Sequence, residues 1–251
     1  MTDRRLPQWR GALFTVALAL LAAHLTACGS TGAVAPAAER TFARTVDLSH
    51  VVREDMPIPA GEAGARLIRD ESGALVQIQL GVGSGSLVRL IAAPGAPISS
   101  LEGLSPRDLV LPAIVIDARD RAQDGPGFLL SAADVRAWEQ TYGLIPPGSL
   151  VLLATGWDLR WGDAGAYLAT EPAPPGFGLD AAALLLDERG VAALGLDAPG
   201  QRLRPASGFR LLLENLTSVE QLPPTGATVV IGALKLQQAE SSPARVLALV
   251  P

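Results

Sequence analysis

The segment AIVIDARDRAQDGPGFLLSAADVRAWEQTYGLIPPGSLVLLA, residues 113–154, contains the clearest folding pattern in the chain. It begins and ends with continuous apolar runs, at 113–117 and 150–154, which are typical of strands buried on both faces. Between them, Ser131 can cap a helix and Asp134 can complete the capping box. The segment therefore predicts two buried strands separated by a helix, as in an α/β domain.

Similar patterns extend outward from this segment. Val135, Trp138 and Tyr142 form an apolar stripe on the helix, which Gly143 ends, and we expect Trp138 to lie in the core. A second helix is predicted with Asp180 as its cap, through Ala181–Arg189 to Gly190. Further strands are predicted at 76–80 (with one face in water), 192–197, 228–231 and 246–250. These elements predict one mixed α/β domain over residues 44–251.

The composition restricts the class of protein. The chain has 251 residues, of which 49% are hydrophobic and 18% charged, so it can bury one substantial core and does not resemble a disordered chain. A single cysteine excludes a disulfide framework or a CxxC zinc site. The net charge of −5 argues against a nucleic-acid partner, and two histidines are few for a zinc or hydrolytic site.

The N-terminal residues indicate export. Three arginines precede the apolar run Gly11–Ala27, which is short for a membrane-spanning helix and suits a signal peptide. Leu25–Cys28 resembles a bacterial lipobox, so we expect residues 1–27 to be removed and Cys28 to carry lipid. A single membrane anchor with a chance cysteine is the alternative.

The segment after the cysteine indicates where the domain is held. Residues 28–43 are rich in Ala, Gly and Pro and predict a tether. Gly29 after the cysteine, by resemblance to Gram-negative lipoproteins, implies the outer membrane, with the domain facing the periplasm. Cleavage would leave His50 as the only histidine.

Four stretches of the chain together carry a family resemblance. They are Val46–His50 with Met56-Pro57, Leu153–Trp157 with Trp161 and Tyr167, Arg189–Asp197, and Glu214–Thr217 with Gln221–Pro223 and Ser242–Val246. As a set they resemble the cyclase family, which includes kynurenine formamidase (arylformamidase) and metal-dependent isatin hydrolases. The resemblance implies a swivelling β/β/α domain, with a mixed sheet and flanking helices, that is usually dimeric. It also implies hydrolysis of an amide or lactam C–N bond with zinc or manganese.

The metal motif of that family is degenerate here. Its signature is H-x-G-T-H-x-D-A-P-x-H, whereas residues 83–93 read GSGSLVRLIAA. Gly83, Leu87 and Ala93 stand at the histidine positions, and Arg89 stands at the aspartate position. A further family histidine shortly before Glu214 is also absent, which leaves Glu214 as the one matching ligand.

This loss predicts the chemistry of the site. A catalytic zinc typically takes three protein ligands, so Glu214 alone could not hold one, and we expect no metal cofactor. Arg89 carries a permanent charge. We expect it to pair with Glu214, because burying a carboxylate without a partner costs a free energy on the order of several kcal/mol. The alternative places Arg89 on the surface.

Other sites are weaker candidates. The glycine-rich loop Gly81–Ser86 lacks the GKS or GKT ending of a phosphate loop, and no GxSxG elbow occurs in the chain. Ser49 and His50 are neighbours that would point to opposite faces of a strand, so we interpret His50 as a structural residue. An acid-only metal site is conceivable but disfavoured, since three of its residues suit strand ends. Its candidates are Asp47, Asp117, Asp197 and Glu214.

The sequence thus favours a lipid-anchored pseudoenzyme that binds a small aromatic or carboxylate ligand. Arg89 would hold the carboxylate, and Trp157 and Trp161 would line an aromatic pocket, as that region does in the family. One alternative is a weak or metal-free amide hydrolase with Glu214 as general base. The other is an envelope interaction protein with an empty pocket. By resemblance, a homodimer is expected.

Overall fold

The computed structural model describes residues 42–97, 100–125 and 127–251. The predicted signal peptide (1–27), Cys28 and nearly all of the predicted tether lie outside the described residues. Within the part that is described, none of the helices combines the length and apolar character that crossing a membrane requires.

The centre of the domain is a mixed sheet of eight strands. The neighbouring pairs from β5 through β7 and β9 to β10 are parallel, and the other pairs are antiparallel. β4 pairs with β12 as well as with β10, so the strands from β12 to β4 close into a ring of seven, and β1 adds to β12 outside it. The order is β1 (Arg44–Asp47), β12 (Ser241–Val250), β11 (Thr228–Ala233), β5 (Val110–Asp117), β7 (Leu150–Ala154), β9 (Ala193–Leu196), β10 (Phe209–Glu214), β4 (Leu87–Ala92).

Short helices and two small sheets complete the fold. The α-helices are α2 (Arg119–Asp124), α3 (Ala132–Tyr142), α4 (Ala164–Tyr167) and α5 (Leu179–Ala183), which continues as the π-helix η4 (Leu184–Glu188). The 3-10 turns are η1 (Leu101–Gly103), η2 (Pro106–Leu109), η3 (Trp157–Arg160) and η5 (Val219–Gln221). The small sheets pair β6 (Leu129–Leu130) with β8 (Gly176–Phe177) and β2 (Arg66–Arg69) with β3 (Leu75–Gln79).

The buried strands separate two hydrophobic cores. Leu150 and Leu152 of β7 belong to a cluster formed mainly by strand residues. Val151 and Leu153, on the other face of β7, belong to a cluster that includes residues of α3, α5 and η4. Because successive side chains of a strand point to opposite faces, a strand between two cores must be apolar throughout. The predicted strands at 113–117 and 150–154 are confirmed, and so is their burial on both faces.

The first predicted helix is confirmed, with two differences on its apolar stripe. Ser131 and Asp134 form the capping box of α3, and Gly143 ends the helix. Trp138 only packs against the edge of the core and is partly buried, and its Nε1 donates to the Val115 carbonyl at 3.0 Å. Tyr142 is exposed, because it lies at the last turn of the helix, beyond the edge of the core.

The second predicted helix has a different cap from the one expected. Gly178, not Asp180, is the N-cap of α5, and a Cβ at Gly178 would lie 2.7 Å from the Leu130 carbonyl oxygen. Asp180 accepts a hydrogen bond from the Ala132 amide at 2.9 Å, so it caps the neighbouring α3. The prediction failed because a capping side chain can serve whichever helix start lies nearest in space.

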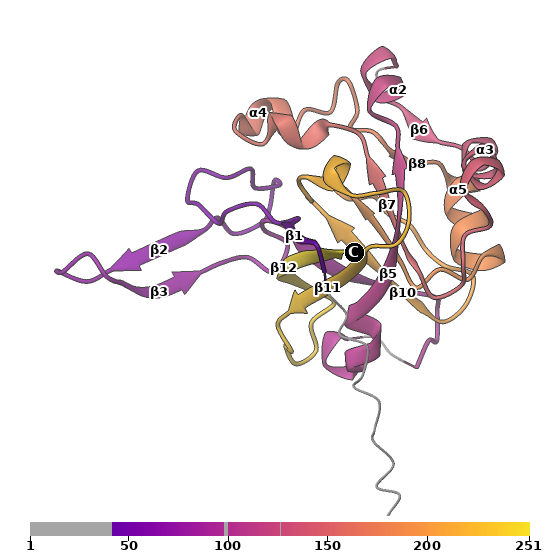
Figure 1. Ribbon diagram of the computed structural model, residues 1–251. Coiled ribbons are helices and arrows are strands. Elements are labelled where there is room, and N and C mark those ends of the chain that lie inside the picture. Colours follow the sequence, from indigo (N-terminus) through magenta and orange to yellow (C-terminus); the bar gives the residue numbers. More distant parts are fainter. Residues whose placement is uncertain (1–41, 98–99, 126) are drawn as a thin grey trace, which may run out of the picture. The chain divides into compact units, whose positions relative to one another are not determined.

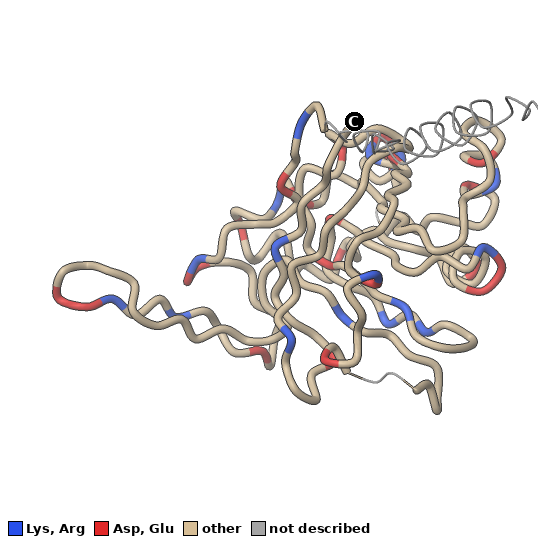
Figure 2. Tube along the Cα trace, turned by 60° about the horizontal axis from the view of Figure 1, so that its bottom comes forward, with Lys and Arg blue, Asp and Glu red and all other residues tan. Residues whose placement is uncertain are grey.

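The strand predicted at 76–80 exists as β3, but its predicted buried face was wrong. All five residues of β3 are exposed. The reason is that, among the described strands, β2 and β3 pair with each other alone and form an arm that extends away from the main sheet (Figure 1). Acidic residues lie at the tip of this arm (Figure 2).

The expected mixed α/β fold with flanking helices is therefore confirmed at the level of class. The sheet itself is better described as a closed ring of seven strands than as the swivelling domain that the resemblance implied. The ring brings β4, which carries the degenerate metal motif, next to β10, which ends at Glu214.

Candidate functional site

The candidate site is centred on an ion pair between two neighbouring strands. Arg89 of β4 lies opposite Leu212 of β10, two residues before Glu214. Its Nε donates to Glu214 Oε1 and its Nη2 donates to Glu214 Oε2, both at 3.2 Å. The Glu214 side chain is only 6% exposed and that of Arg89 is 41% exposed. The predicted pairing of Arg89 with Glu214 is confirmed, and it is bidentate.

A surface hollow of about 700 Å³ opens beside this pair. We call it the Arg89–Glu214 hollow. Gly200 lies directly against the carboxylate, since a Cβ at this position would be 1.8 Å from Glu214 Oε1. Only glycine leaves room for the carboxylate here. The lining residues are Arg89, Leu90, Ile91, Ala92, Pro94, Gly200, Gln201, Arg202, Leu203, Arg204, Glu214 and Glu240.

Several acidic groups compensate the charge of Arg89. The hydrogen bonds to Glu214 raise the pKa of Arg89, partial burial opposes this, and the charges of Glu62 and Glu240 raise it further. The Glu62 carboxylate also fills the space beside Gly83, because a Cβ there would lie 2.9 Å from Glu62 Oε1. At Gly83, the position of the first family histidine, the Glu62 carboxylate therefore lies against the glycine backbone, in the space that a side chain would need.

Asn215 joins the end of β10 to the glycine-rich loop. Its Nδ2 donates to the Gly85 carbonyl at 2.7 Å, and its Oδ1 accepts from the Tyr167 hydroxyl at 2.9 Å. Its carbonyl accepts from Ser86 Oγ at 2.6 Å. Asn215 has φ of 55°, a left-handed conformation that Asn tolerates better than most residues. These bonds hold residues 83–89 against Glu214.

A second buried carboxylate, that of Asp197, directly follows the neighbouring strand β9. Asp197, 3% exposed, accepts hydrogen bonds from the Thr155 amide and the Gly156 amide, each at 2.7 Å. Burial raises the pKa of Asp197 to about 6, although these hydrogen bonds and one from the Thr155 hydroxyl oppose the shift. The adjacent Asp158 accepts from Thr217 Oγ1 at 2.8 Å. Both acids thus serve to tie loops to strand ends.

The two tryptophans do not lie in the Arg89–Glu214 hollow. Trp157 is buried, donates from Nε1 to the Tyr167 carbonyl at 2.9 Å, and contacts Arg160, whose Cζ lies 3.9 Å from the ring centroid. Trp161 is stacked on His50 with ring centroids 4.0 Å apart. Neither belongs to the described residues that line the hollow. The predicted aromatic residues and Arg89 therefore do not line the same hollow. Trp157 instead lines a separate hollow of about 190 Å³ beside η3.

His50 is held as a structural residue would be. Its amide donates to Ser86 Oγ at 2.8 Å, and its ring packs on Trp161. Burial lowers the pKa of His50 to about 4, although Asp158 and the Leu216 backbone act in the opposite direction. Its Nε2 is buried without a hydrogen-bond partner among the described residues. The imidazole is therefore neutral at pH 7, and no hydroxyl in the described part of the chain is hydrogen-bonded to it.

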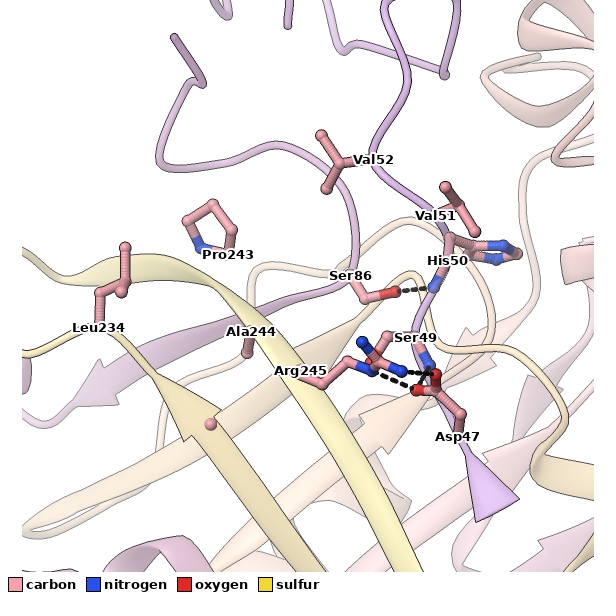
Figure 3. Close-up of a pocket in the computed structure, with 11 residues that line it drawn as sticks. Asp47, Ser49, His50, Val51, Val52, Ser86, Leu234, Pro243, Ala244 and Arg245 are labelled. Atoms are coloured by element: carbon pink, nitrogen blue, oxygen red, sulfur yellow. Dashed lines mark hydrogen bonds and ion pairs between the residues drawn. The ribbon is translucent and has the colours of Figure 1, made fainter. Parts of the chain in front are cut away.

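A second hollow, of about 430 Å³, lies next to the His50 backbone (Figure 3). Asp47 and Arg245 form an ion pair at its floor, with Nη2 and Oδ2 2.6 Å apart. The Ser49 hydroxyl accepts from the Val246 amide at 2.7 Å, and Ser86 Oγ is engaged by His50. The serines here join strands, so this hollow has no activated nucleophile.

The four acids considered for a metal site lie apart and have other partners. Asp47 pairs with Arg245 and Asp117 with Arg119, while Asp197 binds backbone amides. Among residues 42–97, 100–125 and 127–251, no group of three or more His, Cys, Asp or Glu is placed to hold a metal ion.

Two residues of the hollow were missed from the sequence. Arg202 and Arg204 both line it, on either side of the buried Leu203. The signal was present as an Arg-Leu-Arg sequence twelve to ten residues before Glu214. It could not be interpreted without knowing that this loop folds back over β10.

Comparison with known proteins agrees with this fold. Residues 46–201 match the family model Cyclase, described as "Putative cyclase". The chain is 36% identical over 159 residues to isatin hydrolase of Roseibium aggregatum, in an alignment that covers 57% of this chain and 60% of that protein. The chain thus spans less than two thirds of the curated relative that it matches. The match over most of the domain shows that this chain belongs to the cyclase family.

Solved structures extend the comparison. An isatin hydrolase bound to the product analogue thioisatinate has a TM-score of 0.74 at 26% identity, with 98% of this chain and 100% of that chain covered. Isatin hydrolase A from Ralstonia solanacearum has a TM-score of 0.72 at 26% identity, with both chains covered completely. A predicted metal-dependent hydrolase from Bacillus stearothermophilus has a TM-score of 0.60 at 20% identity, with 82% of this chain and 97% of that chain covered. At this identity, the similarity shows the shared fold alone.

The residues of this site do not fit the divalent metal that the resemblance implies. Glycine, leucine and arginine stand where ligands are expected, and none of these side chains can bind a cation. The one matching carboxylate, Glu214, already binds a guanidinium through both oxygens. The arginine therefore occupies the carboxylate that a metal would need.

Proposed function

We propose that this protein is a cyclase-family pseudoenzyme that binds a small carboxylate ligand in the Arg89–Glu214 hollow without metal-dependent hydrolysis. The observation that carries the proposal is the bidentate Arg89–Glu214 pair, in which the guanidinium of Arg89 binds the carboxylate that a metal ion would need. Arg89 uses two of its five N–H groups on Glu214 and remains partly exposed, so it keeps donors for a ligand.

The proposal includes a position in the cell. The signal peptide at 1–27 and lipid on Cys28 would place the domain on a tether at the outer membrane, facing the periplasm. Two or more acyl chains would make this attachment stable. The homodimer that the family resemblance implies belongs to the same proposal. Mass spectrometry of Cys28 tests the anchor, and an unmodified cysteine on a chain that keeps residues 1–27 would overturn it.

A metal-free hydrolase is the weaker reading of the same site. It would require Glu214 to act as a general base, yet both oxygens of this carboxylate accept hydrogen bonds from Arg89. The Gly200 backbone also covers Oε1. A base must reach the proton that it removes, and these contacts limit access to Glu214.

The test combines metal analysis, activity and ligand binding on the purified full-length protein. After incubation with zinc or manganese and desalting, we expect no stoichiometric metal and no isatin or formylkynurenine hydrolysis. Thermal-shift measurements with kynurenine, isatinate and benzoate should show stabilisation by at least one of these carboxylates. One equivalent of bound metal with activity that a chelator abolishes would refute the proposal.

A gain-of-function variant makes this test sharper. The triple change Gly83→His, Leu87→His and Arg89→Asp restores donors at three positions where the resemblance places ligands. The three atoms nearest to a Cβ added at residue 83 all belong to the side chain of Glu62. We expect this variant to retain zinc where the wild type does not. Equal zinc retention by both proteins would mean that the missing donors do not explain the proposed loss of metal binding.

A further inference from the structure

The loop from Ala198 to Ala206 brings two arginines to the Arg89–Glu214 hollow. Arg202 and Arg204 are exposed and line the hollow, whereas Leu203 between them is 5% exposed and belongs to the core next to the helices. The alternation places both arginines on the side of the loop that faces away from the core.

Contacts at three points hold this loop in place. The Asn215 amide donates to the Ala198 carbonyl at 3.1 Å. Gln201 Oε1 accepts from the Phe177 amide at 2.7 Å, and the Ala206 amide donates to Asp187 Oδ1 at 2.8 Å. The loop is thus bonded to β10, β8 and η4, so its arginines are presented from a supported backbone.

The charges of the hollow are distributed unevenly. Arg89 pairs directly with Glu214, which compensates its charge more than any other group does. Within the described part of the chain, neither Arg202 nor Arg204 forms an ion pair with a carboxylate. Glu240 also lines the hollow, but it is exposed, so solvent screens it. The uncompensated positive charge of the hollow therefore lies on the loop.

We propose that Arg202 and Arg204 form the main anion-binding group of the hollow and select a small dicarboxylate over a monocarboxylate. The inference rests on the proposed function and makes its ligand class more specific. Guanidinium groups bind carboxylates through parallel N–H donors, and two of them on one loop can bind two carboxylates. Arg89, already paired, then contributes a secondary contact.

The experiment compares ligands that differ in one carboxylate. Phthalate and benzoate are titrated into the full-length protein by calorimetry at two salt concentrations. We expect phthalate to bind about tenfold more tightly than benzoate, with the steeper salt dependence, as exposed charge-assisted hydrogen bonds allow. In the double variant Arg202→Gln, Arg204→Gln the two affinities should become equal. Arg107→Gln, which removes an exposed arginine of η2 elsewhere, is the matched control and should preserve the preference.

The outcomes separate this inference from the proposed function. Equal binding of the two ligands by the wild type would overturn the dicarboxylate inference and leave carboxylate binding standing. A preference for phthalate that survives in the double variant would overturn the role of the two arginines. If the wild type binds neither ligand, nor kynurenine or isatinate, the proposed function fails and the inference fails with it. Circular dichroism of each variant checks that the fold is retained.

Discussion

Replacing Arg89 with methionine should destabilise the domain more than a typical surface substitution. The change leaves the Glu214 carboxylate, 6% exposed, without the guanidinium that binds both its oxygens. Removing one partner of a buried pair costs about 3–5 kcal/mol. Because the Arg89 side chain is 41% exposed and solvent screens part of the interaction, we expect about 2–3 kcal/mol here. For a domain of this size, that loss lowers Tm by roughly 5–10 °C.

The opposite single variant should cost less. Glu214→Met leaves Arg89 charged, but this side chain reaches solvent and still has Glu62 and Glu240 nearby. We expect a loss of about 1 kcal/mol. The double variant, with methionine at both positions, should be closer to wild type than Arg89→Met alone, since it leaves no unpaired buried charge.

Arg119 offers a matched control for this cycle. Its side chain is also 41% exposed and pairs with Asp117 at 2.7 Å, but Asp117 is 49% exposed. Arg119→Met should therefore cost less than about 1 kcal/mol. Urea unfolding of the full-length proteins at pH 7 measures all four variants. Equal losses for Arg89→Met and Arg119→Met, or additive single losses in the double variant, would show that burial of Glu214 does not set the energy.

Three further predictions concern burial and close packing. Burial raises the pKa of Asp197 to about 6, so the folded state binds more protons than the unfolded state between about pH 4 and 6. As pH rises through this window, the free energy of unfolding of the wild type should fall by roughly 3 kcal/mol relative to that of Asp197→Asn. The pKa of His50 is lowered to about 4, so the unfolded state binds more protons than the folded state as pH falls from about 6.5 to 4, and the wild type loses stability. In urea unfolding, His50→Phe should lose less stability than the wild type over this range. Gly200→Ala should displace the Glu214 carboxylate and weaken benzoate binding in calorimetry, whereas Gly162→Ala, with nothing within 4 Å of the added Cβ, should not. The first two predictions fail if the variant and the wild type show the same pH dependence of unfolding. The third fails if Gly200→Ala and Gly162→Ala bind benzoate equally well.

Much of the fold could be predicted because its signals are local. The continuous apolar runs of β5 and β7 indicated strands between two cores, and Ser131 with Asp134 indicated the start of α3. Such signals need only the period of a strand or helix and the unpaired amides of a helix end. The exposure of β3 was missed because alternating residues on an arm look the same as those on a half-buried strand.

The main pair of the site was also predictable, but its surroundings were not. The sequence alone showed that the ligand positions of the family motif are lost and that Arg89 and Glu214 carry complementary charge. Burial of a carboxylate demands a partner, and this demand made their pairing the physically favoured outcome. The tertiary structure decided the rest: Trp157 and Trp161 lie around η3, away from the hollow, and the Ala198–Ala206 loop brings Arg202 and Arg204 into it. Those placements follow from closure of the strand ring and from loop contacts between residues distant in sequence, which no local pattern encodes.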